Sequence, residues 1–165
     1  MRTRLGAAGL WGIAGVIAML VEAIARLIPV AAAAFDHHFT ALHWILLVVW
    51  VLFIGYSEGY RAFHMAFSPR CVVRAQYLSA HPRALHVVLA PLYCMGLIHA
   101  TKKRLIVSWC VILGITALVI LVRQLDQPWR GIIDGGVVIG LSVGVLSILY
   151  YAFGKPSPVP PDVPD

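Results

Sequence analysis

Four long runs of apolar residues constrain this chain more than any other feature of its sequence. They cover residues 5–30, 43–56, 105–122 and 131–154. A helix that crosses the hydrocarbon core of a bilayer needs roughly 20 mainly apolar residues. Only 12% of the chain is charged, and 61% is apolar, whereas soluble domains carry about 25% charged residues. The sequence therefore predicts an all-α integral membrane protein with a single polytopic domain over residues 1–154.

A fifth apolar run, residues 84–100, is too short to assign from length alone. It has Pro91 near its middle, and only Thr-Lys-Lys-Arg follows it before the next run. A span here would require a very tight turn that carries three positive charges. We expect a short re-entrant or interfacial segment, and the alternative is a protein of five transmembrane helices.

The distribution of lysine and arginine favours four spans over five. If the N-terminus is cytoplasmic and residues 84–100 do not cross, only Arg123 and Arg130 lie outside. Ten cations then lie on the cytoplasmic side: Arg2, Arg4, Arg61, Arg70, Arg74, Arg83, Lys102, Lys103, Arg104 and Lys155. A fifth span would change this division to eight against four. The sequence thus predicts both termini in the cytoplasm.

The two ends of the chain differ in character. Arg2, Arg4 and the apolar run after them could form a secretory signal, but Glu22, Arg26 and Pro29 separate that run from Ala32–Ala34. We therefore expect an uncleaved first span. Residues 155–165 contain five prolines and predict a disordered, extended tail.

A polar segment, residues 57–83, interrupts the apolar pattern. Ser68 and Pro69 are typical of a helix start, and Pro82 of its end. Arg70 and Arg74 then share one stripe with Tyr77, which predicts a basic amphipathic helix in the plane of the inner leaflet.

Upstream of this helix, Glu58, Arg61 and His64 recur every three residues and should share a helix face. Two interpretations of the basic segment stay open. Its charges could only fix the threading of the chain, or they could bind an anionic lipid headgroup or an anionic partner. The predicted lipid or anion site comprises Glu58, Arg61, His64, Arg70 and Arg74.

Two patterns within the spans predict helix contacts. Gly136, Gly140 and Gly144 lie four residues apart and should allow close helix packing, within the chain, across a homodimer or against another membrane protein. Glu22 and Arg26 lie four residues apart in the first span and should form an intramembrane ion pair. The alternative for this pair is a place in the path of a small transporter.

Histidines offer the remaining chemistry. Asp36, His37, His38 and His43 could together bind a transition metal. Alternatively, a haem could lie between two of the three histidines His64, His86 and His99. Cys71, Cys94 and Cys110 form no CxxC motif and should be free thiols.

The sequence matches no catalytic motif, so we expect no enzymatic activity and no cofactor. Its net charge of +6 suggests contact with anionic lipid rather than with nucleic acid. Short loops and an arginine-rich start favour a bacterial inner membrane. The leading hypothesis is an accessory, lipid-interacting or assembly protein, with a redox or metal protein and a transporter as alternatives.

Overall fold

The computed structural model describes residues 5–154, 159–160 and 162, and its described part contains helices and no strand. The elements, in chain order, are α1 (Ala7–Ala33), η1 (Ala34–Asp36), α2 (Ala41–Ile54), η2 (Gly55–Phe67), α3 (Ser68–Ala80), α4 (Ala84–Val88), α5 (Ala90–Cys94), α6 (Lys102–Val122), α7 (Trp129–Leu149) and η3 (Tyr150–Gly154). Arg2, Arg4, Lys155 and most of the predicted tail lie outside the described residues.

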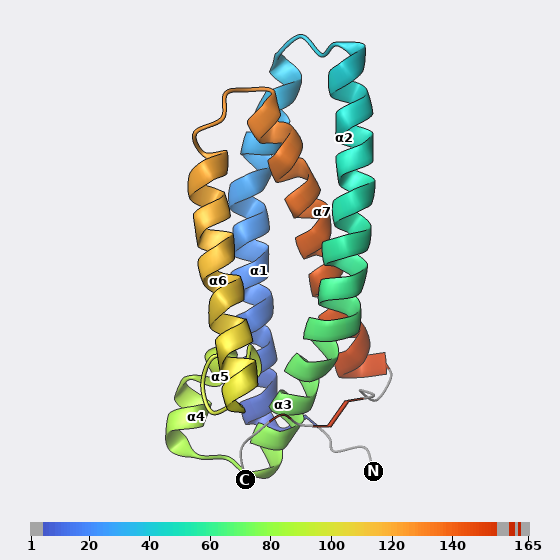
Figure 1. The fold of residues 1–165 in the computed structure, drawn as a ribbon. Helices are drawn as coiled ribbons and strands as arrows, with labels where there is room; N and C mark the ends of the chain where they lie inside the picture. Colours follow the sequence, from blue (N-terminus) through green and yellow to red (C-terminus); the bar gives the residue numbers. More distant parts are fainter. Residues whose placement is uncertain (1–4, 155–158, 161, 163–165) are drawn as a thin grey trace.

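Four helices in the described part of the chain are long and apolar enough to cross a bilayer. They are the helices over Ala7–Asp36, Ala41–Ala80, Lys102–Val122 and Trp129–Gly154. Residues 84–100 instead form α4 and α5, each of five residues, followed by turns. Figure 1 shows that the start of α1 and the end of α7 lie at the same end of the bundle, together with α3, α4 and α5.

The second long helix changes its winding part-way. Its α-helical half, α2, continues through the π-helix η2 directly into α3. Ser68 is therefore not the N-cap that its sequence context predicts: it follows Phe67 inside a continuous helix, and its side chain makes no cap hydrogen bond. A helix that already runs without a break leaves no free N–H groups for a cap to satisfy. The predicted end is confirmed, since α3 finishes at Ala80, before Pro82.

The glycines of α7 allow α2 and η2 to pack closely against it. All three are buried, and a β-carbon added at Gly136 would lie 2.6 Å from the Trp50 indole. At Gly144 it would lie 2.7 Å from the ring of Phe63. The Gly136/Gly140/Gly144 face thus packs against α2 and η2 of the same chain.

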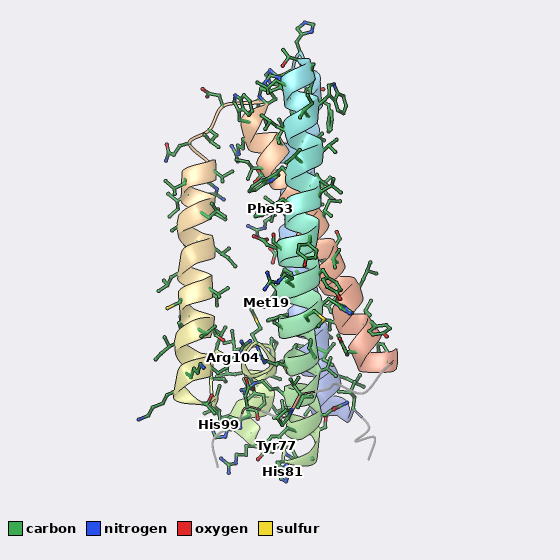
Figure 2. All side chains as sticks on the ribbon, turned by 45° about the vertical axis from the view of Figure 1, so that its right-hand side comes forward. Met19, Phe53, Tyr77, His81, His99 and Arg104 are labelled. Atoms are coloured by element: carbon green, nitrogen blue, oxygen red, sulfur yellow. The ribbon has the colours of Figure 1, made fainter. Side chains whose placement is uncertain are left out.

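Helix α6 stands apart from the other long helices in the view of Figure 2. Ser108 and Val122 are its only buried residues, and a β-carbon at Gly114 would meet no atom within 4 Å. The apolar surface of α6 therefore needs lipid as its solvent.

The main core lies at the other end of the fold from η1, where α1, α3, α5 and α7 meet. It is built from ten buried residues: Ile13, Val16, Cys71, Val72, Ala75, Leu78, Ala90, Tyr93, Cys94 and Ile148. Glycines of α1 bring the neighbouring backbones close, because a β-carbon at Gly12 would lie 2.6 Å from Cys94 Sγ and 3.2 Å from the Ala90 carbonyl oxygen. This packing fixes α5 against α1 rather than across the bilayer.

Substitution of Gly136 by valine should destabilise the fold by about 1–3 kcal/mol, because the added atoms overlap Trp50. The free energy of unfolding in detergent micelles measures the effect. Gly114→Val is the matched control, and we expect it to change stability little, since its site is open. Equal losses in the two variants would contradict the packing described for α7.

Candidate functional site

A buried arginine lies at the centre of the basic end of the protein. Arg74 of α3 is only 1% exposed, although lysine and arginine are almost never fully buried without partners. Its Nε donates to the Tyr93 carbonyl at 2.6 Å, and Nη2 donates to the carbonyls of Ile98 at 2.9 Å and His99 at 3.0 Å. Its guanidinium carbon lies 4.4 Å from the centre of the Tyr93 ring. Arg74 therefore fastens the 84–100 segment to α3.

The remaining donors of Arg74 reach the tail. Nη1 donates to the Asp162 backbone carbonyl at 3.3 Å and to Asp162 Oδ1 at 3.1 Å. Together these contacts engage all five N–H donors of the guanidinium. Each hydrogen bond to a charged group contributes about 1.5–3 kcal/mol, which offsets the cost of removing the charge from water.

The backbone of the 84–100 segment is shaped to present these carbonyls. His99 adopts a left-handed conformation with φ of 46°, which costs a non-glycine residue about 1–2 kcal/mol. The hydrogen bond from Arg74 to its carbonyl compensates for that strain. Gly96 also has a positive φ, 77°, and a β-carbon there would lie 3.1 Å from Arg104 Nε.

Two more arginines surround the same place. Arg104, at the start of α6, points its Nε towards Asp162 Oδ2 at 3.6 Å. This buried nitrogen has no hydrogen-bond partner among the described residues. Arg70 is half-buried one helical turn before Arg74 and lies close enough to Arg104 to interact with it electrostatically. We call Arg70, Arg74 and Arg104 the arginine cluster.

A group of aromatic rings adjoins Arg74 through Tyr93. The His86 ring lies 4.5 Å from the His99 ring and 5.1 Å from the Tyr93 ring, measured between centroids. Burial raises the pKa of Tyr93 to about 12, against the opposing effect of the Arg74 charge. Desolvation lowers the pKa of His86, and positive charge on His99, Arg83 and Arg74 lowers it further. Both side chains thus favour their neutral forms.

Glu58, Arg61 and His64 do not share one face, contrary to the prediction from their spacing. Glu58 is half-buried beside Gly140, and His64 Nδ1 lies 3.1 Å from Ser147 Oγ, so both point at α7. Arg61 is exposed. The reason is the winding of η2, because a π-helix bonds i to i+5 and does not align residues three apart as an α-helix does.

The other predicted groups are dispersed. Glu22 and Arg26 form an ion pair on α1 with both side chains largely exposed. His43 Nδ1 accepts the Thr40 backbone N–H at 3.1 Å and so acts in the helix cap of α2, while His37 and His38 are exposed. In the described part of the chain, no three His, Cys, Asp or Glu side chains are grouped to hold a metal ion.

The three histidines considered as haem ligands pack against other aromatic rings. His64 packs against Tyr60, Tyr150 and Tyr151, away from the pair formed by His86 and His99. That pair is in direct ring contact, whereas two axial ligands would have to face each other across a porphyrin.

Sequence reasoning named Arg70 and Arg74 as candidates but did not name Arg104 or Asp162, which the structure places beside them. Arg104 was assigned only to the positive surface, and Asp162 only to a disordered tail. One signal existed: Asp162 and Asp165 are the only acids after Asp134, and their tail follows a span whose predicted cytoplasmic side is strongly basic. The partnership of Arg74 with backbone carbonyls leaves no such trace in the sequence.

Comparison of the chain with protein-family models, with curated proteins and with solved structures found no match. The function proposed for this chain therefore rests on the geometry and the charge of the site.

Replacement of Arg74 by methionine should destabilise the protein by about 3–5 kcal/mol, since it leaves the part-buried carbonyls of Ile98 and His99 without donors and Asp162 without its buried partner. Arg83→Met, at an exposed arginine, is the control and should stay within about 0.5 kcal/mol of the native protein. Unfolding in detergent micelles measures both. A mild effect of Arg74→Met would show that the guanidinium does not hold the 84–100 segment.

Replacement of His99 by asparagine, which tolerates a left-handed backbone, should raise the pKa of His86 towards its usual value near 6.5. The reason is that the charge on His99 contributes to lowering it. Because the native pKa is lowered, His86 contributes stability above about pH 6.5, and this stability is lost as the pH falls through the native pKa. An NMR titration of the His86 ring protons reports the pKa directly. No change in His99→Asn would refute the coupling of the two rings.

Proposed function

We propose that this chain is a small accessory protein of a bacterial inner membrane, without catalytic activity of its own, that binds anionic lipids at one end. In this proposal the lipid-binding end and both termini face the cytoplasm. The end in question, which we call the basic end, contains Arg61, Arg70, Arg74, Arg83, Lys102, Lys103 and Arg104.

The observation that carries the proposal is the difference in charge between the two ends of the bundle. The basic end, where α3, α4 and the start of α6 lie together (Figure 1), contains seven cations and the carboxylates of Glu58 and Asp162, which gives it a net charge of +5. The opposite end carries two cations and three carboxylates, which gives it a net charge of −1: Arg123, Arg130, Asp36, Asp126 and Asp134. This difference in charge favours contact of the basic end, but not of the opposite end, with an anionic leaflet.

The cations of the basic end fall into two groups by exposure. Arg61, Arg83, Lys102 and Lys103 are exposed and can reach lipid phosphates at the interface. Each such residue contributes about 1 kcal/mol next to an anionic leaflet. The arginine cluster is half-buried or buried and faces inwards, so it does not act through long-range attraction alone.

The lipids retained by the protein test the proposal. We expect the protein to enrich phosphatidylglycerol over phosphatidylcholine, as measured by mass spectrometry of the lipids that remain bound in neutral detergent. Arg83→Gln should lower this enrichment about fivefold, which corresponds to about 1 kcal/mol. Added salt should weaken the native preference, since exposed charges are screened.

Arg123→Gln, an exposed arginine at the opposite end, is the matched control and should leave the enrichment unchanged. If it lowers the enrichment as much as Arg83→Gln does, the basic end has no special role. A native protein that shows no anionic preference would overturn the proposal altogether.

A further inference from the structure

Asp162 covers a set of hydrogen-bond donors that converge on one point. Two of them belong to Arg74 Nη1, and a third is the Thr101 backbone N–H, which donates to the Asp162 carbonyl at 3.2 Å. Arg104 Nε faces the second carboxylate oxygen at 3.6 Å. Donors of this kind, fixed by a buried guanidinium and a helix start, form a preorganised binding site for an anion.

The carboxylate of Asp162 neutralises this place only in part. The arginine cluster brings three positive charges, and Asp162 is the acid that forms ion pairs with it among the described residues. The local charge is therefore +2 with Asp162 in place. A phosphomonoester carries about −1.5 to −2 at neutral pH, compared with −1 for a carboxylate or a phosphodiester. The site thus fits a phosphomonoester better than the group that occupies it.

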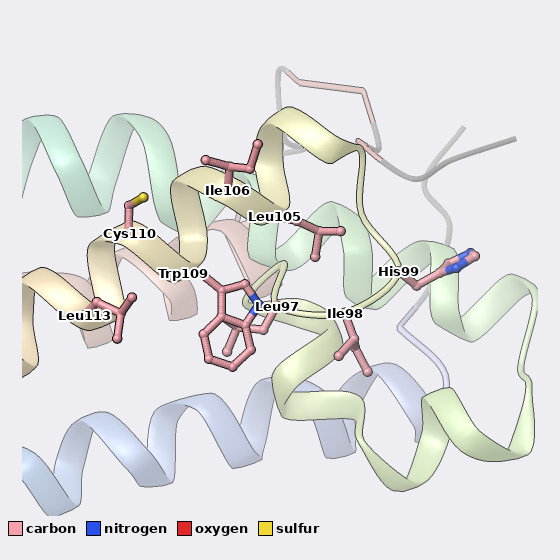
Figure 3. Close-up of a pocket in the computed structure, with 8 residues that line it drawn as sticks. All are labelled: Leu97, Ile98, His99, Leu105, Ile106, Trp109, Cys110 and Leu113. Atoms are coloured by element: carbon pink, nitrogen blue, oxygen red, sulfur yellow. The ribbon is translucent and has the colours of Figure 1, made fainter.

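An apolar groove opens beside the cluster. It has a volume of about 630 Å³ and is lined by Leu97, Ile98, His99, Leu105, Ile106, Trp109, Cys110 and Leu113. Figure 3 shows Trp109 lying against Leu97, with Ile98 and Leu105 continuing the lining and the His99 imidazole directed away at the rim. Six of these side chains are aliphatic or aromatic, so acyl chains suit the groove and a free inorganic ion does not.

The groove and the arginine cluster lie on adjoining faces of the same helix turn. Arg104 and Ser108 of α6 face Gly96 and Met95, and the next residues along the helix, Leu105 and Trp109, line the groove. In Figure 2, Arg104 and His99 both lie near the base of α6. A headgroup at the cluster would therefore place its acyl chains along α6, which is otherwise exposed to lipid.

We propose that Arg70, Arg74 and Arg104 bind the phosphomonoester headgroup of a lipid whose acyl chains lie in the groove along α6, and that Asp162 occupies this headgroup site until the lipid displaces it. This inference rests on the proposed function, since it names one anionic lipid and one site within the basic end. It also explains why a carboxylate of the tail reaches a buried arginine.

Binding of short-chain lipids to the full chain in neutral detergent tests the site. Dioctanoyl phosphatidic acid, a phosphomonoester, should bind about tenfold more tightly than dioctanoyl phosphatidylglycerol, a phosphodiester. Asp162→Asn should strengthen phosphatidic acid binding about tenfold, because it removes the competing charge, and Arg104→Gln should weaken it by a similar factor. Asp126→Asn, an exposed acid at the opposite end, is the control and should have no effect.

Cys110 provides a second readout, because it lines the groove and is exposed while Cys71 and Cys94 are buried. Phosphatidic acid should slow its reaction with N-ethylmaleimide at least fivefold, and inorganic phosphate should not. If inorganic phosphate competes with phosphatidic acid equally and Cys110 stays reactive, the cluster binds free phosphate and the lipid proposal is wrong.

The outcomes separate this inference from the proposed function. If Asp162→Asn leaves phosphatidic acid binding unchanged, or if the two lipids bind equally, the headgroup site is overturned while a general preference for anionic lipid can persist. If Arg83→Gln fails to lower the lipid enrichment but Asp162→Asn strengthens phosphatidic acid binding, the headgroup site is supported, and the proposed role of the exposed cations of the basic end is wrong. Thermal unfolding of Asp162→Asn and Arg104→Gln checks that both variants remain folded.

Discussion

The guanidinium of Arg74 supplies hydrogen-bond donors to backbone carbonyls that the irregular 84–100 segment cannot satisfy by itself. After α5 the backbone leaves the helical hydrogen-bond pattern, and the carbonyls of Tyr93, Ile98 and His99 lie in a region that the surrounding protein largely shields from water. Arg74 donates to all three. Non-helical backbone at this depth is tolerated only where protein groups satisfy it. Because α1 and α3 pack on both sides of this segment, the arrangement of the whole basic end depends on that one side chain.

Around this anchor the protein has two regions with different packing. At the basic end, small residues of α1 and the buried residues of α3 and α5 form a dense core. Towards the other end, contact is reduced to α1, α2 and α7, where the glycines of α7 receive Trp50 and Phe63. Helix α6 contacts the main core through its first turns, where Ser108 donates to the Met95 carbonyl at 3.5 Å, and Val122 is buried at its other end. Because lipid is as apolar as its side chains, little drives the rest of α6 against the bundle.

The proposed lipid site lies where these two regions of different packing meet. A dense, positively charged core fixes the donors, and a loosely packed apolar helix beside it offers a surface for acyl chains. The tail carboxylate of Asp162 lies between them and links Arg74 to Arg104. A site built this way combines a rigid headgroup pocket with a lipid-exposed groove, so that its electrostatic part determines specificity and its apolar part adds affinity.

The sequence by itself determined the membrane environment, the all-helical fold, the long apolar helices and the short helix that ends before Pro82, because these depend on local composition and on the absence of a backbone donor in proline. It also located the arginine-rich segment. It could not reveal the π-helix η2, which separates Arg61 from Glu58 and His64 and packs against α7. Only the tertiary structure turned Arg74 from a surface charge into a buried anchor and brought Asp162 to it across 88 residues. The physical reason is that backbone carbonyls, which every residue carries, are the partners of Arg74, and no residue pattern marks which carbonyls will be left without a helix to bind them.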